Sequence, residues 1–140
     1  MDKEKGKLLA KEALLARTHA YAPYSNFWVG AALLTKEGKV YTGCNIENAA
    51  FGPGNCAERT AIFKAVSEGE RDFCAIAIAG GAKDAKELSI CAPCGVCRQV
   101  MMEFCNPQTF LILLVTDEEV YEEHTLLELF PMGFGPQNLS

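Results

Sequence analysis

Two short stretches of the chain bring together residue types that can bind a metal ion and move protons. The first is Cys56-Ala57-Glu58-Arg59, which places a thiol, a carboxylate and a guanidinium at the start of a helical pattern. The second is Pro93-Cys94-Gly95-Val96-Cys97, which opens another helical pattern. Cys94 and Cys97 are three positions apart, so on a helix their side chains share one face. A helix N-terminus lowers the pKa of a thiol, and the thiolate is the form that binds metals.

These three cysteines predict a catalytic zinc site. Three protein ligands with one open position are typical of catalytic zinc, whereas structural zinc sites have four ligands. Zinc lowers the pKa of a water in the open position, and Glu58 is placed to move that water's protons. By position alone Glu58 fits an ordinary first-turn glutamate, favoured by the helix dipole, equally well. Three thiolates on Zn²⁺ leave a net negative site, and we expect Arg59 to offset that charge.

The bulk properties favour one domain that acts on small molecules. A chain of 140 residues is expected to form a single domain, here 1–140. Its net charge of −5 leaves it without the basic face that nucleic-acid binding needs. The first residues show no signal or transit peptide, and no apolar run could span a bilayer. We therefore expect a cytoplasmic protein with no membrane or nucleic-acid partner, whose seven cysteines are mostly reduced.

The hydrophobic periodicity predicts an α/β arrangement that can bring the two cysteine stretches together. From residue 40 the order is strand, helix, strand, helix, strand, which favours parallel strands joined by right-handed crossovers. Both crossover helices then begin at the edge of the sheet where ligands bind in open α/β folds. The expected helices cover 3–19, 56–68, 94–105 and 125–128; the expected strands cover 26–35, 40–44, 73–79, 109–115 and, briefly, 120–122; the segment 131–140 is expected to be irregular.

The motifs resemble those of a known enzyme family. Cys56-Ala57-Glu58 with Pro93-Cys94-x-x-Cys97 is similar to the signature of the zinc nucleobase deaminases, with Cys in place of the first His. More narrowly, the chain resembles cytidine deaminases of the small homotetrameric class. The other matching stretches are Tyr21-Ala-Pro-Tyr-Ser25, Phe27, Val29-Gly-Ala-Ala32, Gly43-Cys-Asn-Ile-Glu-Asn-Ala49, Arg98-Gln99 and Leu129-Phe-Pro-Met-Gly-Phe-Gly-Pro136.

The resemblance implies a three-layer α/β/α fold with a mixed five-stranded sheet, and zinc-dependent hydrolysis of cytidine and deoxycytidine in pyrimidine salvage. It implies a homotetramer whose pockets are completed by neighbouring subunits. It also implies a role for each site residue: Cys56, Cys94 and Cys97 bind zinc; Glu58 is the proton shuttle; Asn45 and Glu47 bind the ribose 3′-hydroxyl; the backbone of Ala57 holds the base; Phe27 packs on the pyrimidine; and Phe134 closes a neighbouring subunit's pocket.

Other interpretations of the cysteines and of the activity stay open at this stage. Cys91, Cys94 and Cys97 resemble the start of an iron–sulfur run, but Met101 stands where the fourth cysteine would be. Cys91 is also an alternative zinc ligand. The substrate could be another aminopyrimidine nucleoside, such as a nucleoside antibiotic. The chain could also be a zinc-stabilised interaction module without activity; editing of polymeric DNA or RNA is disfavoured by the net charge.

Overall fold

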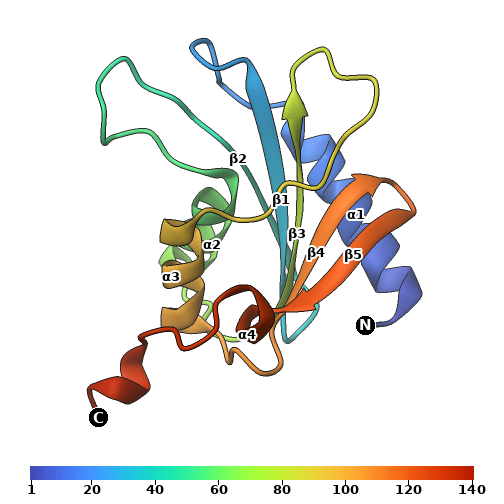
Figure 1. The fold of residues 1–140 in the computed structure, drawn as a ribbon. Coiled ribbons are helices and arrows are strands. Elements are labelled where there is room, and N and C mark those ends of the chain that lie inside the picture. Colours follow the sequence, from blue (N-terminus) through green and yellow to red (C-terminus); the bar gives the residue numbers. More distant parts are fainter.

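A mixed five-stranded β-sheet forms the centre of the protein, and helices cover both of its faces (Figure 1). The structure is a computed structural model that describes residues 1–140. The strands lie in the order β2-β1-β3-β4-β5 across the sheet. In chain order the elements are α1 (Lys3–Arg17), β1 (Phe27–Thr35), β2 (Val40–Cys44), α2 (Ala57–Ser67), β3 (Phe73–Ala82), α3 (Gly95–Phe104), β4 (Leu111–Asp117), β5 (Val120–Thr125), α4 (Leu126–Leu129) and the 3₁₀ helix η1 (Pro136–Asn138).

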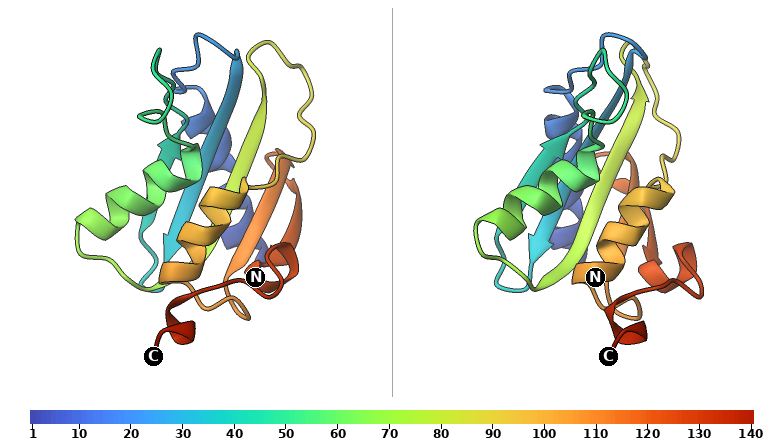
Figure 2. Two further views of the ribbon diagram at one scale, coloured as in Figure 1. Left: turned by 60° about the vertical axis from the view of Figure 1, so that its left-hand side comes forward. Right: turned by 90° about the vertical axis from the view of Figure 1, so that its left-hand side faces the viewer.

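The directions of the strands place the starts of α2 and α3 at one edge of the sheet. β1 pairs antiparallel with both β2 and β3, and β3 pairs parallel with β4. β2, β3 and β4 therefore run the same way, although β1 separates β2 from β3. The helices that follow β2 and β3 lie side by side on one face, and α1 lies on the other (Figure 2). The predicted α/β/α layers and mixed sheet are confirmed.

Strand β3 shows how the sequence divides the core into two layers. Its side chains alternate between the faces of the sheet, as strand geometry requires. Ile76 and Ile78 belong to the cluster beneath α2 and α3. Ala75, Ala77 and Ala79 belong to the cluster beneath α1. All five side chains are fully buried. The small residues on the second face let α1 pack close to the sheet, while the bulkier face supports the two helices that carry the cysteines.

A glycine sets the distance between β2 and the first turn of α2. A Cβ atom at Gly43 would lie 2.5 Å from the Ala57 carbonyl oxygen and 2.6 Å from the Ala61 nitrogen, which are both backbone atoms. Only a residue without a side chain allows this approach. The start of α2, and with it Cys56, is therefore held against the end of β2.

The element boundaries differ from the expected ones in informative ways. Helices α2 and α3 begin one residue later than predicted, because Cys56 and Cys94 are their N-caps. Strand β3 continues to Ala82 instead of ending at residue 79. Gly80 and Gly81 leave room for the side chains of Cys91 and Leu88 in the loop that follows, so the strand continues three residues beyond its predicted end. α1 ends at residue 17, β4 is shifted to 111–117, and β5 continues to residue 125.

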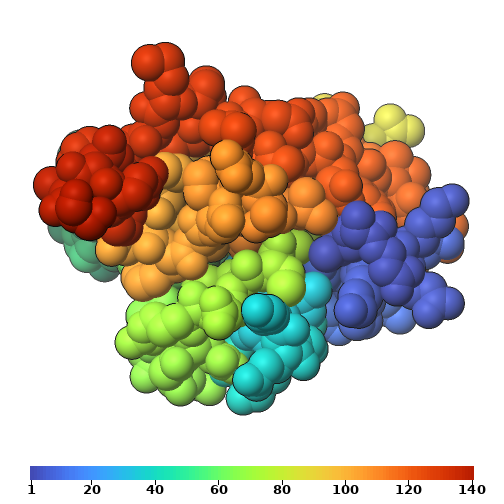
Figure 3. Space-filling model, turned by 90° about the horizontal axis from the view of Figure 1, so that it is seen from below, coloured from blue at the N-terminus to red at the C-terminus, as the bar shows by residue number.

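The C-terminal segment packs against helix α3. Thr125 and Glu128 form a capping box at the start of α4, the short helix predicted here. The segment predicted to be irregular contains η1, and it lies beside α3 at the surface of the molecule (Figure 3). The Gln99 side-chain amide donates a hydrogen bond to the Phe134 carbonyl at 2.8 Å, which ties the segment to α3. None of the helices has the length and apolarity that a membrane span requires.

Candidate metal centre and adjoining pocket

Two helix N-termini carry cysteine where a capping residue is expected. Cys56 is the N-cap of α2 and Cys94 is the N-cap of α3, and neither side chain makes a capping hydrogen bond. Ser, Thr, Asp and Asn are the residues usually found there, because their oxygen atoms accept from the free N–H groups. The sulfurs are thus left free for another partner, at a helix end that stabilises negative charge.

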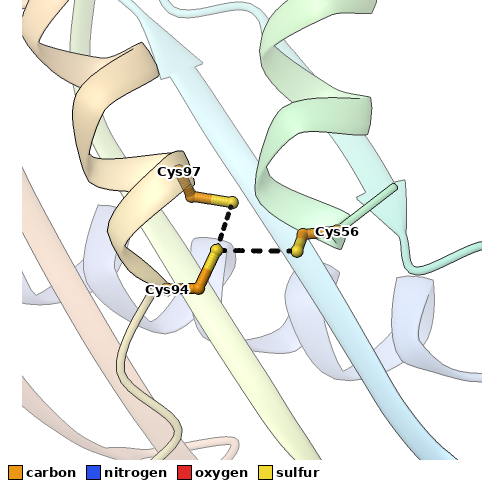
Figure 4. A group of neighbouring side chains, drawn as sticks. All are labelled: Cys56, Cys94 and Cys97. Atoms are coloured by element: carbon orange, nitrogen blue, oxygen red, sulfur yellow. Dashed lines mark hydrogen bonds between the residues drawn. The ribbon is translucent and has the colours of Figure 1, made fainter. Parts of the chain in front are cut away.

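The three sulfurs predicted to bind a metal are brought together. Cys56 Sγ lies 3.7 Å from Cys94 Sγ, which lies 3.5 Å from Cys97 Sγ. All three lie within 4.8 Å of one another, and they point toward one another from two neighbouring helices (Figure 4). A tetrahedral zinc ion with Zn–S bonds of about 2.3 Å needs sulfurs about 3.8 Å apart. The spacing therefore fits a single ion.

The protonation of the three sulfurs also indicates that the site needs a cation. The Arg59 guanidinium donates a hydrogen bond to Cys56 Sγ at 3.3 Å. Hydrogen bonding from Cys97, and then from Arg59 and Cys94, lowers the pKa of Cys56 to about 5. The same contact between the two sulfurs raises the pKa of Cys97. Arg59 alone thus supports one thiolate, and a divalent cation would be needed to hold all three sulfurs deprotonated.

Glu58 is the one charged side chain in the buried core of the molecule. It lies in the first turn of α2 and is 4% exposed. Burial raises the pKa of Glu58 to about 7, and the charge of the neighbouring Cys56 contributes to this increase. Burying an ionisable carboxyl group costs folding free energy, so packing alone does not account for its place beside the thiols. Its position favours the catalytic interpretation over that of an ordinary first-turn glutamate.

Cys91 lies near the site but outside the group of metal-binding sulfurs. The group comprises Cys56, Cys94 and Cys97 alone. The Cys91 sulfur lies close to Gly80, where a Cβ atom would be only 2.7 Å away. Burial, followed by the charges of Glu58 and Cys56, raises the pKa of Cys91 to about 11. Cys91 lines the pocket but lies outside the group of three sulfurs that could hold one ion, which disfavours both the iron–sulfur run and the alternative zinc ligand.

A pocket of about 750 Å³ opens over the sulfurs. Its wall combines most of the loop 45–55 with the first turn of α2 and the residues just before α3. Cys56, Glu58 and Cys94 all line it, so two of the clustered sulfurs and the buried carboxyl group face one space. Asn45, Glu47 and Ala57 line the same pocket, as the family resemblance implied for groups that contact a nucleoside.

Asn45 and Glu47 are held by backbone groups of the segment 24–29 of the same chain. The Asn45 side chain accepts from the Val29 N–H at 2.9 Å and donates to the Phe27 carbonyl at 2.8 Å. Glu47 Oε1 accepts from the N–H groups of Tyr24 at 3.0 Å and of the following serine at 3.2 Å. Both side chains are therefore fixed before any ligand arrives.

Two aromatic residues of the predicted site do not line this pocket. Phe27 is 42% exposed at the start of β1, and the nearby Val29 faces the pocket instead. Phe134 is 56% exposed and lines a separate cavity of about 280 Å³ beside α3. Within one chain, Phe134 and the pocket lie on different parts of the surface. Its assignment to a neighbouring subunit stays a prediction.

Comparison with known proteins identifies the family. Residues 3–113 match the family model described as the cytidine and deoxycytidylate deaminase zinc-binding region. The chain belongs to this deaminase family. It is 48% identical over 134 residues to a cytidine deaminase of Halalkalibacterium halodurans, covering 96% of this chain and 97% of that one. It is 47% identical over 140 residues to a cytidine deaminase of Sporosarcina psychrophila, covering 100% and 96%. The crystal structure of a cytidine deaminase from Burkholderia pseudomallei superposes with a TM-score of 0.81 at 46% identity, covering 91% of this chain and 97% of that one.

Membership of the deaminase family confirms the predicted cofactor. The family is defined by a zinc-binding region, and the three-sulfur group of this chain can hold a metal ion. The predicted family and fold are confirmed by the same findings.

Sequence reasoning missed one residue that supports the metal centre of this deaminase. Arg98 donates from Nε to the Pro93 carbonyl at 2.7 Å and from a terminal nitrogen to the Leu129 carbonyl at 2.9 Å. It thus fixes the backbone just before Cys94. The only signal in the sequence was its position directly after the cysteine motif, where an arginine on a helix has many other possible roles.

Proposed function

We propose that this protein catalyses the hydrolytic deamination of cytidine and deoxycytidine to uridine and deoxyuridine. The observation that carries the proposal is a buried carboxyl group, Glu58, which faces the same pocket as Cys56 and Cys94, two of the three clustered sulfurs. The relatives of this chain that are named cytidine deaminases favour the same substrate. We assign the reaction to pyrimidine salvage in the cytoplasm, by a chain that forms one domain over 1–140.

The metal would be held by Cys56, Cys94 and Cys97. Bound zinc would supply a Lewis acid that makes water nucleophilic near neutral pH. Arg59 donates to the Cys56 sulfur and offsets part of the negative charge that three thiolates bring to the site. Arg98 keeps the start of α3 in place through its bond to the Pro93 carbonyl. These residues hold the ion and set its charge, while the proton transfers fall to the neighbouring carboxyl group.

Glu58 performs the proton transfers of the reaction. It accepts a proton from the attacking water and delivers it to ring N3, while the oxygen of the water bonds to C4. Glu58 then passes the second proton to the exocyclic amino group, and the C4–N bond breaks to release ammonia. Burial keeps bulk water from competing for these protons, because the side chain is 4% exposed.

Asn45 and Glu47 have the remaining hydrogen-bonding capacity for one hydroxyl group. A carboxylate offers about four acceptor positions, and two N–H groups and one serine hydroxyl occupy three of them in Glu47. The Asn45 amide has used one of its two N–H groups and keeps the other. One free donor and one free acceptor match the acceptor and donor of a sugar hydroxyl. We assign the ribose 3′-hydroxyl to this pair.

The remaining contacts complete the proposed nucleoside site. The backbone N–H of Ala57 belongs to the first turn of α2, where it has no partner within the helix, and it is assigned to the base. Phe27, whose carbonyl binds Asn45, is assigned to the face of the pyrimidine. Phe134 is assigned to the pocket of a neighbouring subunit in a homotetramer. Its exposure within one chain supports this role.

The proposal is tested with a nucleoside panel on zinc-loaded protein. Cytidine and deoxycytidine should each lose their characteristic absorbance and release one equivalent of ammonia, and adenosine should do neither. Glu58→Gln keeps the size and most of the polarity of the side chain but cannot move protons, so it should lose at least about a thousandfold in kcat while it retains zinc. If another aminopyrimidine nucleoside is turned over in preference to cytidine, that nucleoside and not cytidine is the substrate. No turnover of any nucleoside would leave the protein a zinc-stabilised interaction module.

A further inference from the structure

Ser25 lies at the centre of a hydrogen-bonded chain at the mouth of the pocket. Its hydroxyl accepts from the Phe27 N–H at 3.1 Å and donates to Glu47 Oε2. Its own backbone N–H donates to Glu47 Oε1. Two groups of one residue thus bind the two oxygens of one carboxylate, and the same residue links that carboxylate to the start of β1.

The number of available protons decides which group donates in each of these hydrogen bonds. A hydroxyl group has one proton to donate. The Phe27 N–H already donates to Ser25 Oγ, so the Ser25 proton must go to the Glu47 carboxylate, which can only accept when ionised. The bond from the Ser25 hydroxyl, followed by the backbone bonds, lowers the pKa of Glu47. The carboxylate therefore stays an acceptor, with its orientation fixed and one position free.

The backbone around Ser25 is anchored independently of the hydroxyl group. Asn26 has a φ of 55°, in the left-handed region that asparagine tolerates better than most residues. Its N–H donates to the Ala22 carbonyl at 3.0 Å, and its carbonyl accepts from the Lys83 N–H at 2.7 Å. These bonds fold the chain so that Ser25 Oγ faces the Phe27 N–H. Removing the hydroxyl group should therefore leave the turn in place and affect mainly the carboxylate.

We propose that Ser25 is a positioning residue for sugar recognition, which orients the Glu47 carboxylate so that its free acceptor and the free N–H of Asn45 bind one hydroxyl group together. The inference rests on the proposed function, because it takes the sugar hydroxyl of a nucleoside as the ligand of this pair. It goes further in assigning a role to a residue that does not line the pocket and acts through Glu47. It also ties sugar binding to the aromatic residue at position 27, because the same hydroxyl group accepts from that residue's N–H.

The test compares substrates that have and lack the hydroxyl group. Ser25→Ala should lower kcat/KM for cytidine about tenfold, mainly through KM, since it removes one hydrogen bond to a charged group. For 3′-deoxycytidine the same substitution should change kcat/KM by less than about twofold, because there is no hydroxyl group to bind. Ser25→Thr keeps the hydroxyl group and should stay within about threefold of the unchanged protein for both nucleosides.

A control substitution and a binding measurement separate the possible outcomes. Ser67→Ala removes an exposed serine hydroxyl that donates to the Lys64 carbonyl, remote from the pocket, and should change neither substrate. Dissociation constants of both nucleosides are measured by calorimetry on Glu58→Gln protein, with and without Ser25→Ala. Ser25→Ala should raise the dissociation constant of cytidine about tenfold and that of 3′-deoxycytidine by less than about twofold. If cytidine is not turned over at all, the proposed function fails and these constants still decide the role of Ser25. If Ser25→Ala changes binding of both nucleosides equally, or of neither, the proposed positioning role of Ser25 is wrong.

Discussion

Replacing Arg59 with Gln should weaken zinc binding, because it removes the one cation in contact with the sulfurs. Its guanidinium lies 3.3 Å from Cys56 Sγ. With three thiolates and one dication the centre carries a net charge of −1, and this arginine neutralises it. Arg59 Nε is buried without a hydrogen-bond partner, so placing this side chain here costs desolvation free energy. We infer that the favourable interaction of the guanidinium with the Cys56 sulfur exceeds this desolvation cost.

The size of the effect follows from that contact. At this separation and an effective dielectric of about 20, the Coulomb energy of the pair is about 5 kcal/mol. The guanidinium is partly exposed, so solvent screening and desolvation reduce the net value to that of a charged hydrogen bond, about 1.5–3 kcal/mol. At about 1.4 kcal/mol per factor of ten, zinc should dissociate about 10- to 150-fold more readily from Arg59→Gln.

The assay is competition with a chromophoric chelator at fixed pH. Arg71→Gln is the matched control, because the Arg71 guanidinium binds only the carbonyls of Val66 and Glu70, at the far end of α2. It should bind zinc as tightly as the unchanged protein. A zinc affinity for Arg59→Gln within about twofold of this control would refute the argument that the arginine offsets the charge of the sulfurs.

Three other predictions concern the fold and its thiols. Gly43→Ala should destabilise the protein by about 1–3 kcal/mol in urea titrations and weaken zinc binding, because a methyl group there meets the backbone of α2. Removal of zinc by a chelator should make the exposed Cys94 react readily with maleimide at pH 8, while Cys105 stays slow because burial raises its pKa to about 12. The bond to Glu122 raises the pKa of His124, so its contribution to stability is present below the unfolded pKa and is lost as the pH rises through the folded value. That loss should be a few tenths of a kcal/mol and absent in His124→Gln.

Each of these has a control within the same chain. Gly95→Ala places a methyl group in open space in the first turn of α3 and should not lower the urea midpoint. Unfolded protein should show both thiols reacting at the same rate. His19 forms no ion pair in the structure, so His19→Gln should keep the pH dependence of the unchanged protein. Equal stability of the two glycine variants, a fast Cys105 in the folded chain, or the same pH dependence with and without His124 would contradict the respective predictions.

The metal-binding group could be predicted from the sequence because each half of it is encoded locally. Pro93 marks a helix start, and two cysteines three apart at such a start share a face. That Cys56 meets them depends on strand direction, which the alternation of strands and helices predicted correctly. The insertion of β1 between β2 and β3 has no local signal, because pairing partners are set by the whole sheet.

The hydrogen-bonded groups at the pocket mouth could not be predicted in the same way. Ser25 belongs to a short polar turn, and serine is common in turns for reasons unrelated to any site. Its contact with Glu47 joins residues 22 positions apart, and only the folded chain reveals it. Asn45 and Glu47 were assigned by resemblance alone, and their remaining hydrogen-bonding capacity became visible only after their internal partners were known. The contact of Phe27 with the pyrimidine stays a prediction, and within one chain Val29, two residues further along β1, lines the pocket.

The central claim is that the three sulfurs of Cys56, Cys94 and Cys97 bind one zinc ion and leave one position to solvent. X-ray absorption at the zinc edge, on purified protein with a measured metal content, tests it most directly. The account predicts one zinc per chain with three sulfur neighbours at about 2.3 Å and one lighter neighbour at about 2.0 Å. Four sulfur neighbours, with Cys91 as the fourth, or no bound zinc would contradict it, since either result removes the site at which water is made nucleophilic.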